Sequence, residues 1–152
     1  MKNIWEYATH SPEETQELAV KIARFLTPGD VITLEGDLGA GKTSFTKGLA
    51  RGLGVTKNVN SPTFTIIKEY EGTVPFFHMD AYRVEDQWED LGLDEYFEGK
   101  GVTVVEWPSM IGEQLPSERL AITIKNQGDT HRHLYFHPFG GRYISICEEI
   151  FV

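Results

Sequence analysis

The sequence predicts an α/β protein with a mixed, largely parallel central sheet and flanking helices, and three observations support this. A helix-start signature leads into an amphipathic segment over residues 12–26. Short β-favouring runs at 31–35 and 102–105 have the character of buried strands. The last third of the chain alternates in polarity, which predicts antiparallel strands toward the C-terminus.

Composition narrows the class of protein. At 152 residues the chain is expected to form a single domain over 1–152, and 40% hydrophobic content is typical of a folded one. The formal net charge of −9 argues against the chain being a principal nucleic-acid binder, because phosphate neutralisation requires Lys and Arg. Cys147 has no partner for a disulfide and is expected on a buried strand. With no signal peptide or membrane-length apolar run, we expect a cytoplasmic protein that does not use a membrane.

The first predicted helix has a clear start. Ser11 is placed as N-cap, Pro12 occupies the first helical position, and Glu14 completes a capping box. The segment 27–30, TPGD, ends the helix and turns the chain into the 31–35 strand. The apolar positions that should cover a sheet face are Leu18, Ala19, Ile22, Phe25 and Leu26.

A phosphate-binding motif lies between the 31–35 strand and a helical pattern over 44–53. The sequence GDLGAGKT at 36–43 satisfies G-x-x-x-x-G-K-[ST], in which glycines let backbone N–H groups wrap around a triphosphate. The following helix contributes the partial positive charge of its N-terminus. We expect ATP contacts from the loop and its next residue: Gly36, Asp37, Leu38, Gly39, Ala40, Gly41, Lys42, Thr43 and Ser44.

Two side chains of the motif carry specific chemistry. Lys42 is placed to reach the β- and γ-phosphates, and the Thr43 hydroxyl is placed to bind Mg²⁺. A glycine-rich turn without a ligand would need neither. The motif and its flanks therefore predict a P-loop NTPase fold, with Phe45, Leu49 and Leu53 on the buried face of the helix.

The polar segment 55–64 allows two interpretations. It is either an ordinary connection or a loop that orders with triphosphate, with Ser61 or Thr63 near the γ-phosphate. Beyond it, residues 65–70 and 74–78 predict an antiparallel hairpin, and Pro75 places its strand near a sheet edge or at a strand end.

Carboxylates follow two predicted strands. His78 and Asp80 point to the same side of their strand, either as a surface hydrogen-bonding arrangement or as groups that hold Mg²⁺ or orient water. Glu106 ends the 102–105 strand, where open α/β sheets place their ligands, and is the best second Mg²⁺ ligand; the alternative is an exposed carboxylate.

The remaining segments are assigned by pattern. Residues 84–99 are acidic and predict a solvated helical face, or a surface for a basic partner. A short helix is expected over 109–115. Strands are expected over 119–125, 131–137 and 142–147, the first two as a hairpin. His131, His133 and His137 share a strand face, but no cysteine or carboxylate of that strand completes a tetrahedral metal set, which favours solvated histidines.

Phosphate-loop proteins of this size are mainly kinases, GTP switches and ATPases that drive a partner. A kinase clamps its acceptor with arginines, but those after Thr43 are scattered: Arg51, Arg83, Arg119, Arg132 and Arg142. The N-K-x-D motif of common GTP switches is absent from the sequence. The pattern therefore favours an ATPase.

Four ordered motifs resemble the bacterial TsaE family, also called YjeE, over roughly residues 10–125. They are GDLGAGKT at 36–43, SPTF at 61–64, HMDAYR at 78–83 and EWP at 106–108. The resemblance implies an ATPase that works with TsaD-like and TsaB-like partners in forming threonylcarbamoyladenosine on tRNAs reading codons that begin with A. The partners, not this chain, would hold the tRNA.

The resemblance also implies residue roles. Lys42 would bind phosphate, Thr43 and Glu106 would hold Mg²⁺, and Asp80 would support ATP hydrolysis. Thr63 would lie in the switch-like loop, and Trp107 would lie close to the nucleotide. Two other functions stay open: a small-molecule kinase that needs no protein partner, and a binding module in which ATP selects a conformation without significant turnover.

Overall fold

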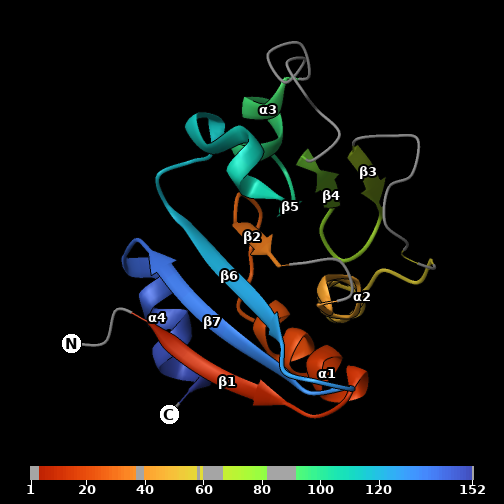
Figure 1. Ribbon diagram of the computed structural model, residues 1–152. Coiled ribbons are helices and arrows are strands. Elements are labelled where there is room, and N and C mark those ends of the chain that lie inside the picture. The colour runs from red at the N-terminus through yellow and green to blue at the C-terminus, as the bar shows by residue number, and fades with distance from the viewer. Residues whose placement is uncertain (1–3, 37–39, 58, 60–66, 82–91, 152) are drawn as a thin grey trace.

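The fold is built around a seven-stranded sheet (Figure 1). The computed structural model describes residues 4–36, 40–57, 59, 67–81 and 92–151. The strands are β1 Trp5–Thr9, β2 Val31–Glu35, β3 Ile67–Tyr70, β4 Phe76–Asp80, β5 Val102–Glu106, β6 Arg119–Asn126 and β7 Arg132–Phe139. The α-helices are α1 Pro12–Ala23, α2 Lys42–Gly52, α3 Leu93–Phe97 and α4 Gly141–Ile150, with the 3₁₀ helix η3 at Pro108–Gln114.

The strand order is β1-β7-β6-β2-β5-β4-β3. Strands β6, β2, β5 and β4 form a parallel core, while β1, β7 and β3 pair antiparallel at the two sides. The mixed sheet is confirmed, but among the described strands parallel pairings do not outnumber antiparallel ones, so "largely parallel" overstates the parallel share. Because parallel strands end at the same edge, the ends of β2, β4, β5 and β6 lie together there.

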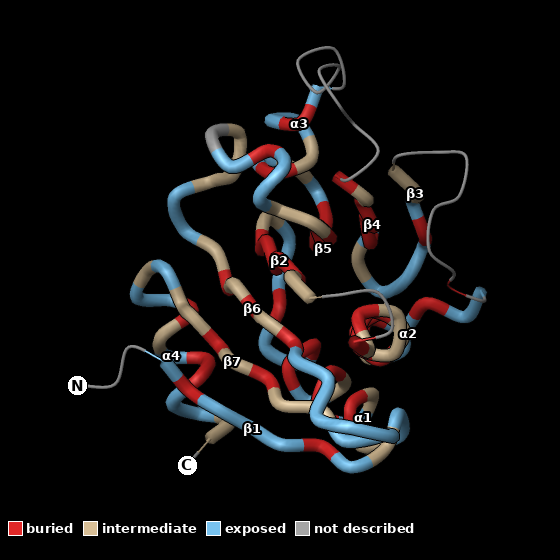
Figure 2. The backbone as a smooth tube through the Cα atoms, in the orientation of Figure 1, coloured by how far each residue is buried: buried red, intermediate tan, exposed pale blue. Residues whose placement is uncertain are grey.

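Helices cover both faces of the sheet (Figure 2). Buried residues of α1, α2 and α4 form one hydrophobic core with β2, β5, β6 and β7. A smaller core on the other face joins β4 and β5 to α3 and η3. None of the helices in the described ranges is both long and apolar enough to span a membrane.

The predicted start of α1 is confirmed at Ser11 and Pro12, but the Glu14 carboxylate accepts from the His10 N–H at 3.3 Å, one residue before the N-cap, and so does not form the predicted capping box. The Ser11 side chain caps the helix by accepting from the Glu14 N–H at 3.1 Å, with Pro12 in the first turn. The helix ends at Ala23, earlier than its apolar pattern suggested. Phe25 was wrongly expected on the buried face: it lies beyond the helix end and is 37% exposed.

The two predicted hairpins are also confirmed. β3 pairs with β4, and β6 pairs with β7. Pro75 comes directly before β4, which agrees with a strand end, because β4 itself lies between two neighbours. The short helix expected near 109–115 is present as η3. Strand β1, which pairs with β7, was not expected from the sequence.

The strand predicted over 142–147 is wrong, because these residues belong to α4. Its buried residues, Tyr143, Ile146 and Cys147, recur at i, i+3 and i+4, which is the period of a helix. The isoleucines favour strands locally, but packing against β7 selects the helix. Cys147 is buried as predicted, although on a helix.

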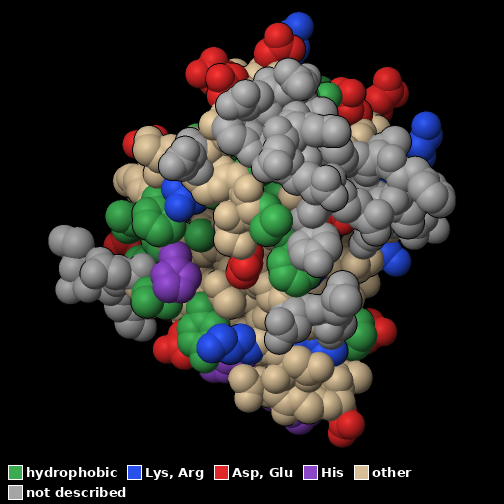
Figure 3. Space-filling model, turned by 45° about the horizontal axis from the view of Figure 1, so that its top comes forward, with side chains coloured by type: hydrophobic (Ala, Val, Ile, Leu, Met, Phe, Trp, Pro, Cys, Tyr) green, Lys and Arg blue, Asp and Glu red, His purple; other side chains and the backbone are tan. Residues whose placement is uncertain are grey.

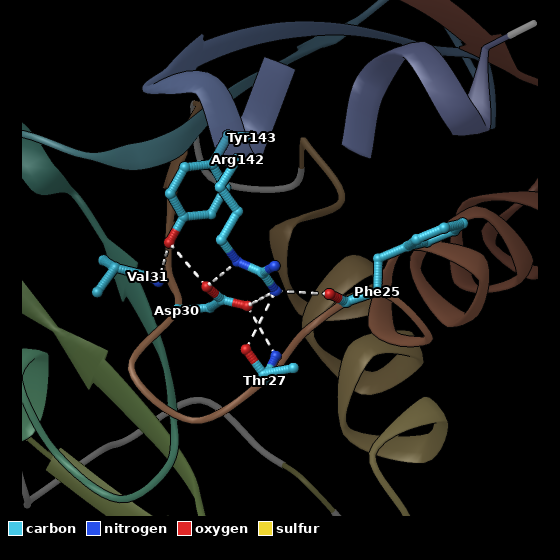
Figure 4. A network of polar contacts seen from close by, with 6 residues as sticks. All are labelled: Phe25, Thr27, Asp30, Val31, Arg142 and Tyr143. Atoms are coloured by element: carbon cyan, nitrogen blue, oxygen red, sulfur yellow. Dashed lines mark hydrogen bonds and ion pairs between the residues drawn. The ribbon is translucent and has the colours of Figure 1, made fainter. Parts of the chain in front are cut away.

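A polar network ties the start of α4 to the loop before β2 (Figure 4). Asp30 is buried and accepts from Arg142 Nη2 at 2.6 Å and Nε at 2.7 Å. The Tyr143 hydroxyl accepts from the Val31 N–H at 3.0 Å and donates to Asp30 at 3.2 Å. Burial raises the pKa of Tyr143 to about 12.

Candidate functional site

The candidate site lies at the edge where the parallel strands end. β2 leads into the phosphate motif at Gly36, β4 ends at Asp80 and β5 ends at Glu106. Asp80 and Glu106 are partners in the register of β4 and β5. Since partners in a sheet share a face, both carboxylates point to the same side of the sheet.

The start of α2 has the features of an anion site. Gly41 is the N-cap with φ of +106°, a conformation that favours glycine, and it offers no side chain to the first N–H groups of the helix. Those groups and the helix dipole can bind an anion. Gly36 and Ala40 flank the loop, whereas Asp37, Leu38 and Gly39 lie outside the described residues.

The Lys42 ammonium group lies against the Gly36 carbonyl and the Trp107 ring. Its Nζ donates to the Gly36 carbonyl at 2.6 Å and lies 3.7 Å from the centroid of the Trp107 ring. The side chain is almost fully buried despite its charge. Its ammonium group therefore lies among loop backbone and an aromatic face, where a phosphate would gain a direct partner. Trp107 reaches this position from a left-handed backbone, φ +59°, directly after β5.

Glu106 has a hydrogen-bond partner that was not expected from the sequence. His78 Nε2 is hydrogen-bonded to Glu106 Oε2, and both residues are buried. His78 and Asp80 do share a side of β4, as predicted. The signal available was the alternation along β4, but the bond itself depends on register with a strand 28 residues away.

The donor set fits Mg²⁺ bound together with a nucleotide. No group of three His, Cys, Asp or Glu side chains that could hold a metal occurs in the described ranges. Mg²⁺ in nucleotide sites takes one or two protein oxygens and is otherwise held by phosphate and water. Thr43, half-buried in the first turn of α2, and the carboxylates at the strand ends are the side chains that could supply such oxygens.

A cavity of about 490 Å³ adjoins the first residue of the loop. Glu35, Gly36 and Trp107 form one side, and residues 123–127, at the end of β6, form the other. Arg132, at the start of β7, packs beside the loop with its Nε 3.6 Å from the position of a Cβ on Gly41. The place of Arg132 could not be predicted from the sequence, because only the fold brings it to the loop.

Other predicted features lie elsewhere or outside the described residues. Ser44 follows Thr43 in α2 and is half-buried. Ser61 and Thr63 fall within 60–66, which lie outside the described residues. His133 Nε2 donates to the Glu6 carboxylate at 2.9 Å, so this histidine is paired and not simply solvated.

The described part of the acidic segment is solvated. Helix α3 carries the exposed residues Asp94 and Glu95, and the exposed Glu98 follows it. Acidic side chains gather at this end of the molecule (Figure 3). Residues 84–91 of the same segment lie outside the described residues.

Comparisons with known proteins agree with one another. A family model described as threonylcarbamoyl adenosine biosynthesis protein TsaE matches residues 9–134. The tRNA threonylcarbamoyladenosine biosynthesis protein TsaE of Bacillus subtilis (strain 168) is 61% identical over 146 residues, covering 95% of this chain and 92% of that protein. The protein of the same name from Treponema pallidum (strain Nichols) is 37% identical over 83% of this chain and 95% of its own length. The crystal structure of YdiB from Bacillus subtilis matches with a TM-score of 0.87 and 54% identity over 99% of this chain and 95% of that one.

Proposed function

The chain belongs to the TsaE family, and on this basis we propose that it binds and hydrolyses Mg-ATP to support a partner complex that forms threonylcarbamoyladenosine on tRNAs reading codons that begin with A. The family also implies the P-loop fold that the motif at 36–43 predicts. The observation that supports the proposal most directly is the meeting of Gly36, Lys42, Asp80 and Glu106 at one sheet edge.

Each residue has a proposed role. The loop N–H groups and Lys42 bind the β- and γ-phosphates, where the buried ammonium group already lies against the loop backbone. Thr43 and Glu106 would hold Mg²⁺, which neutralises charge on the phosphate oxygens when bound. Asp80, in register with Glu106, supports hydrolysis by orienting water at the γ-phosphate.

We further propose that TsaD-like and TsaB-like proteins are the partners and that tRNA is held by them. The net charge of −9 disfavours strong binding of this chain to a phosphate backbone. The chemistry of transfer would then take place on a partner, while ATP hydrolysis here drives the cycle of the complex.

The test is ATP hydrolysis by the pure chain, with and without the two partners. Stimulation by the partners supports the proposed ATPase. Turnover that depends on a small phosphoryl acceptor would instead identify a kinase, and nucleotide binding with no turnover in either condition would identify a binding module. Lys42→Ala should remove ATP binding in calorimetry, and Lys47→Ala, on the same helix, serves as the control.

A further inference from the structure

His78 is a fully buried polar side chain close to the candidate site. It lies in β4 with 0% exposure, two residues before Asp80 and on the same side of the strand. Its Nε2 bonds Glu106, and its Nδ1 has no hydrogen-bond partner among the described residues. The interaction with Glu106 is therefore the only hydrogen bond of the ring in the described part of the chain.

This pattern differs from that of an ordinary core histidine. Buried polar atoms normally find partners, and a histidine kept for packing would be expected to satisfy both ring nitrogens. Here an apolar side chain would avoid the cost of the unpaired Nδ1. The ring instead forms its one hydrogen bond among the described residues with a carboxylate at the end of the neighbouring strand.

The geometry determines how Glu106 can act. His78 faces Val104 in the strand register, two residues before the Asp80–Glu106 pair, so its ring reaches along the sheet toward the strand ends. When the Glu106 carboxylate is ionised, the Nε2 N–H donates to Oε2. One carboxylate oxygen is then fixed by the ring, and Oε1 is left for the nucleotide site.

We propose that His78 is a positioning residue for Glu106: it holds the carboxylate so that a single oxygen, Oε1, is presented to Mg²⁺ or to the water around it. This inference rests on the proposed function, since it assigns the site to Mg-nucleotide. Partners that orient a metal-binding carboxylate commonly affect metal affinity or activity by about 10–100-fold.

The test compares His78→Leu, which removes the donor, with His78→Gln, which keeps an N–H group. Calorimetry measures ATP affinity as Mg²⁺ is titrated, and again in excess chelator. For His78→Leu we expect the Mg²⁺ concentration at half-maximal effect to rise about tenfold, with Mg-free ATP affinity unchanged within about twofold. His78→Gln should recover most of the wild-type Mg²⁺ response.

Two controls separate positioning from damage to the fold. Met79→Leu changes the adjacent, fully buried residue of β4, which belongs to the core on the other face, and should leave the Mg²⁺ response unchanged. In a double-mutant cycle, His78→Leu should add nothing once Glu106→Gln is present, because both act through one carboxylate. Additive effects of the two changes would overturn the proposal.

The remaining outcomes are also decisive. Equal losses of ATP affinity with and without Mg²⁺ in His78→Leu, or no rescue by His78→Gln, would overturn the positioning role. A wild-type chain without any Mg²⁺ response would overturn it as well. If the Mg²⁺ response behaves as expected while the partners fail to stimulate hydrolysis, the positioning role stands and the proposed ATPase function falls.

Discussion

At the residue scale, Gly36 and Gly41 are glycines for different steric reasons. A Cβ on Gly36 would lie 2.6 Å from the Ile124 carbonyl oxygen of β6, a contact that the backbone cannot avoid without moving. Gly41 instead needs its left-handed conformation at the start of α2. The first glycine therefore couples the phosphate loop to the neighbouring strand, and the second allows the loop to enter the helix.

Replacing Gly36 by Ala should consequently disturb both stability and nucleotide binding. Overpacking against a backbone oxygen should lower the free energy of unfolding by about 1–3 kcal/mol, and ATP affinity should fall because the loop must shift. Urea unfolding and calorimetry measure the two effects. Gly141→Ala is the matched control, since a Cβ there meets nothing within 4 Å. Equal stability of the two variants would contradict the steric role of Gly36.

Tyr143 should give the folded state a measurable dependence on alkaline pH. Burial raises the pKa of its hydroxyl to about 12, above the usual value near 10. The neutral hydroxyl is thus favoured in the folded state. Its contribution to the free energy of unfolding is complete below pH 10 and is lost as the pH rises through 12. By pH 11 the loss in unfolding free energy should be about 1 kcal/mol.

Tyr143→Phe isolates this contribution. At pH 8 the variant should be less stable by about 1–3 kcal/mol, because the buried Val31 N–H loses its acceptor. Urea unfolding between pH 8 and 11 should show the gap to wild type narrowing. The Cys147 thiol, whose pKa burial raises to about 11, is common to both proteins, so its effect cancels in the difference. A constant gap would show that the hydroxyl does not titrate as its burial requires.

The sequence predicted the places of several candidate site residues where a motif specifies them, and their roles stay predictions. Lys42 and Gly41 follow from the chemistry of phosphate binding, and Glu106 follows from its place at a strand end. The bond between His78 and Glu106 was missed because it depends on the pairing of β4 with β5, which no local spacing reveals. Arg132 was missed for the same reason, since only the pairing of β6 and β7 brings it beside the loop.

At the scale of elements, helices α1 and α2 pack at close range through two glycines of α2. A Cβ on Gly48 would lie 2.4 Å from the Gln16 carbonyl oxygen, and one on Gly52 would lie 2.5 Å from the Ala23 Cβ. The two glycines are four residues apart and so share one face of the helix. This face brings the backbone of α2, the helix of the phosphate loop, directly against α1.

Gly48→Ala tests whether this close packing outweighs helix propensity. Alanine in an exposed helix would stabilise by about 1 kcal/mol relative to glycine. Here the clash with backbone should exceed that gain and give a net loss of about 1–2 kcal/mol in urea unfolding. Arg51→Ala, at an exposed position of the same helix, should stay within about 0.5 kcal/mol of wild type. A stabilised Gly48→Ala protein would mean that the helices can separate at little cost.

Elements with caps or strict alternation were predictable, and elements chosen by tertiary packing were not. The Ser11 cap located the start of α1, and alternating polarity located β6 and β7. The stretch at 142–147 combines β-favouring isoleucines with helical spacing. Its burial against β7 and α1 favours the helix α4 over a strand. The segment 5–9 is largely exposed, so it lacks the buried run that identifies a strand.

At the scale of the whole molecule, the C-terminal helix α4 is attached by contacts with segments that are distant in the sequence. Asp30 and Arg142 are 112 residues apart, yet their ion pair fixes α4 beside the entry to β2. Phe151 also packs against Tyr7 of β1 and Phe136 of β7. These contacts attach α4 to the sheet and to the loop before β2.

Breaking the Asp30–Arg142 pair should therefore loosen α4 and lower the stability of the whole domain. Arg142→Ala leaves a buried carboxylate without its cation, which should lower the free energy of unfolding. Because the guanidinium is half-exposed, we expect this loss to be about 2 kcal/mol. Arg24→Ala, an exposed charge at the end of α1, is the control and should change stability by less than about 0.5 kcal/mol.

Asp30→Asn combined with Arg142→Ala should recover part of this loss, because no unpaired buried charge remains. Chemical denaturation gives the free energies, and amide hydrogen exchange should show faster exchange in α4 than in β2 for Arg142→Ala. If α4 kept wild-type protection while the domain lost stability, the pair would be stabilising the loop before β2 alone. If only α4 loosens, ATP affinity should stay unchanged. If the loop before β2 loosens instead, ATP affinity should fall, because that loop leads through β2 into the phosphate loop.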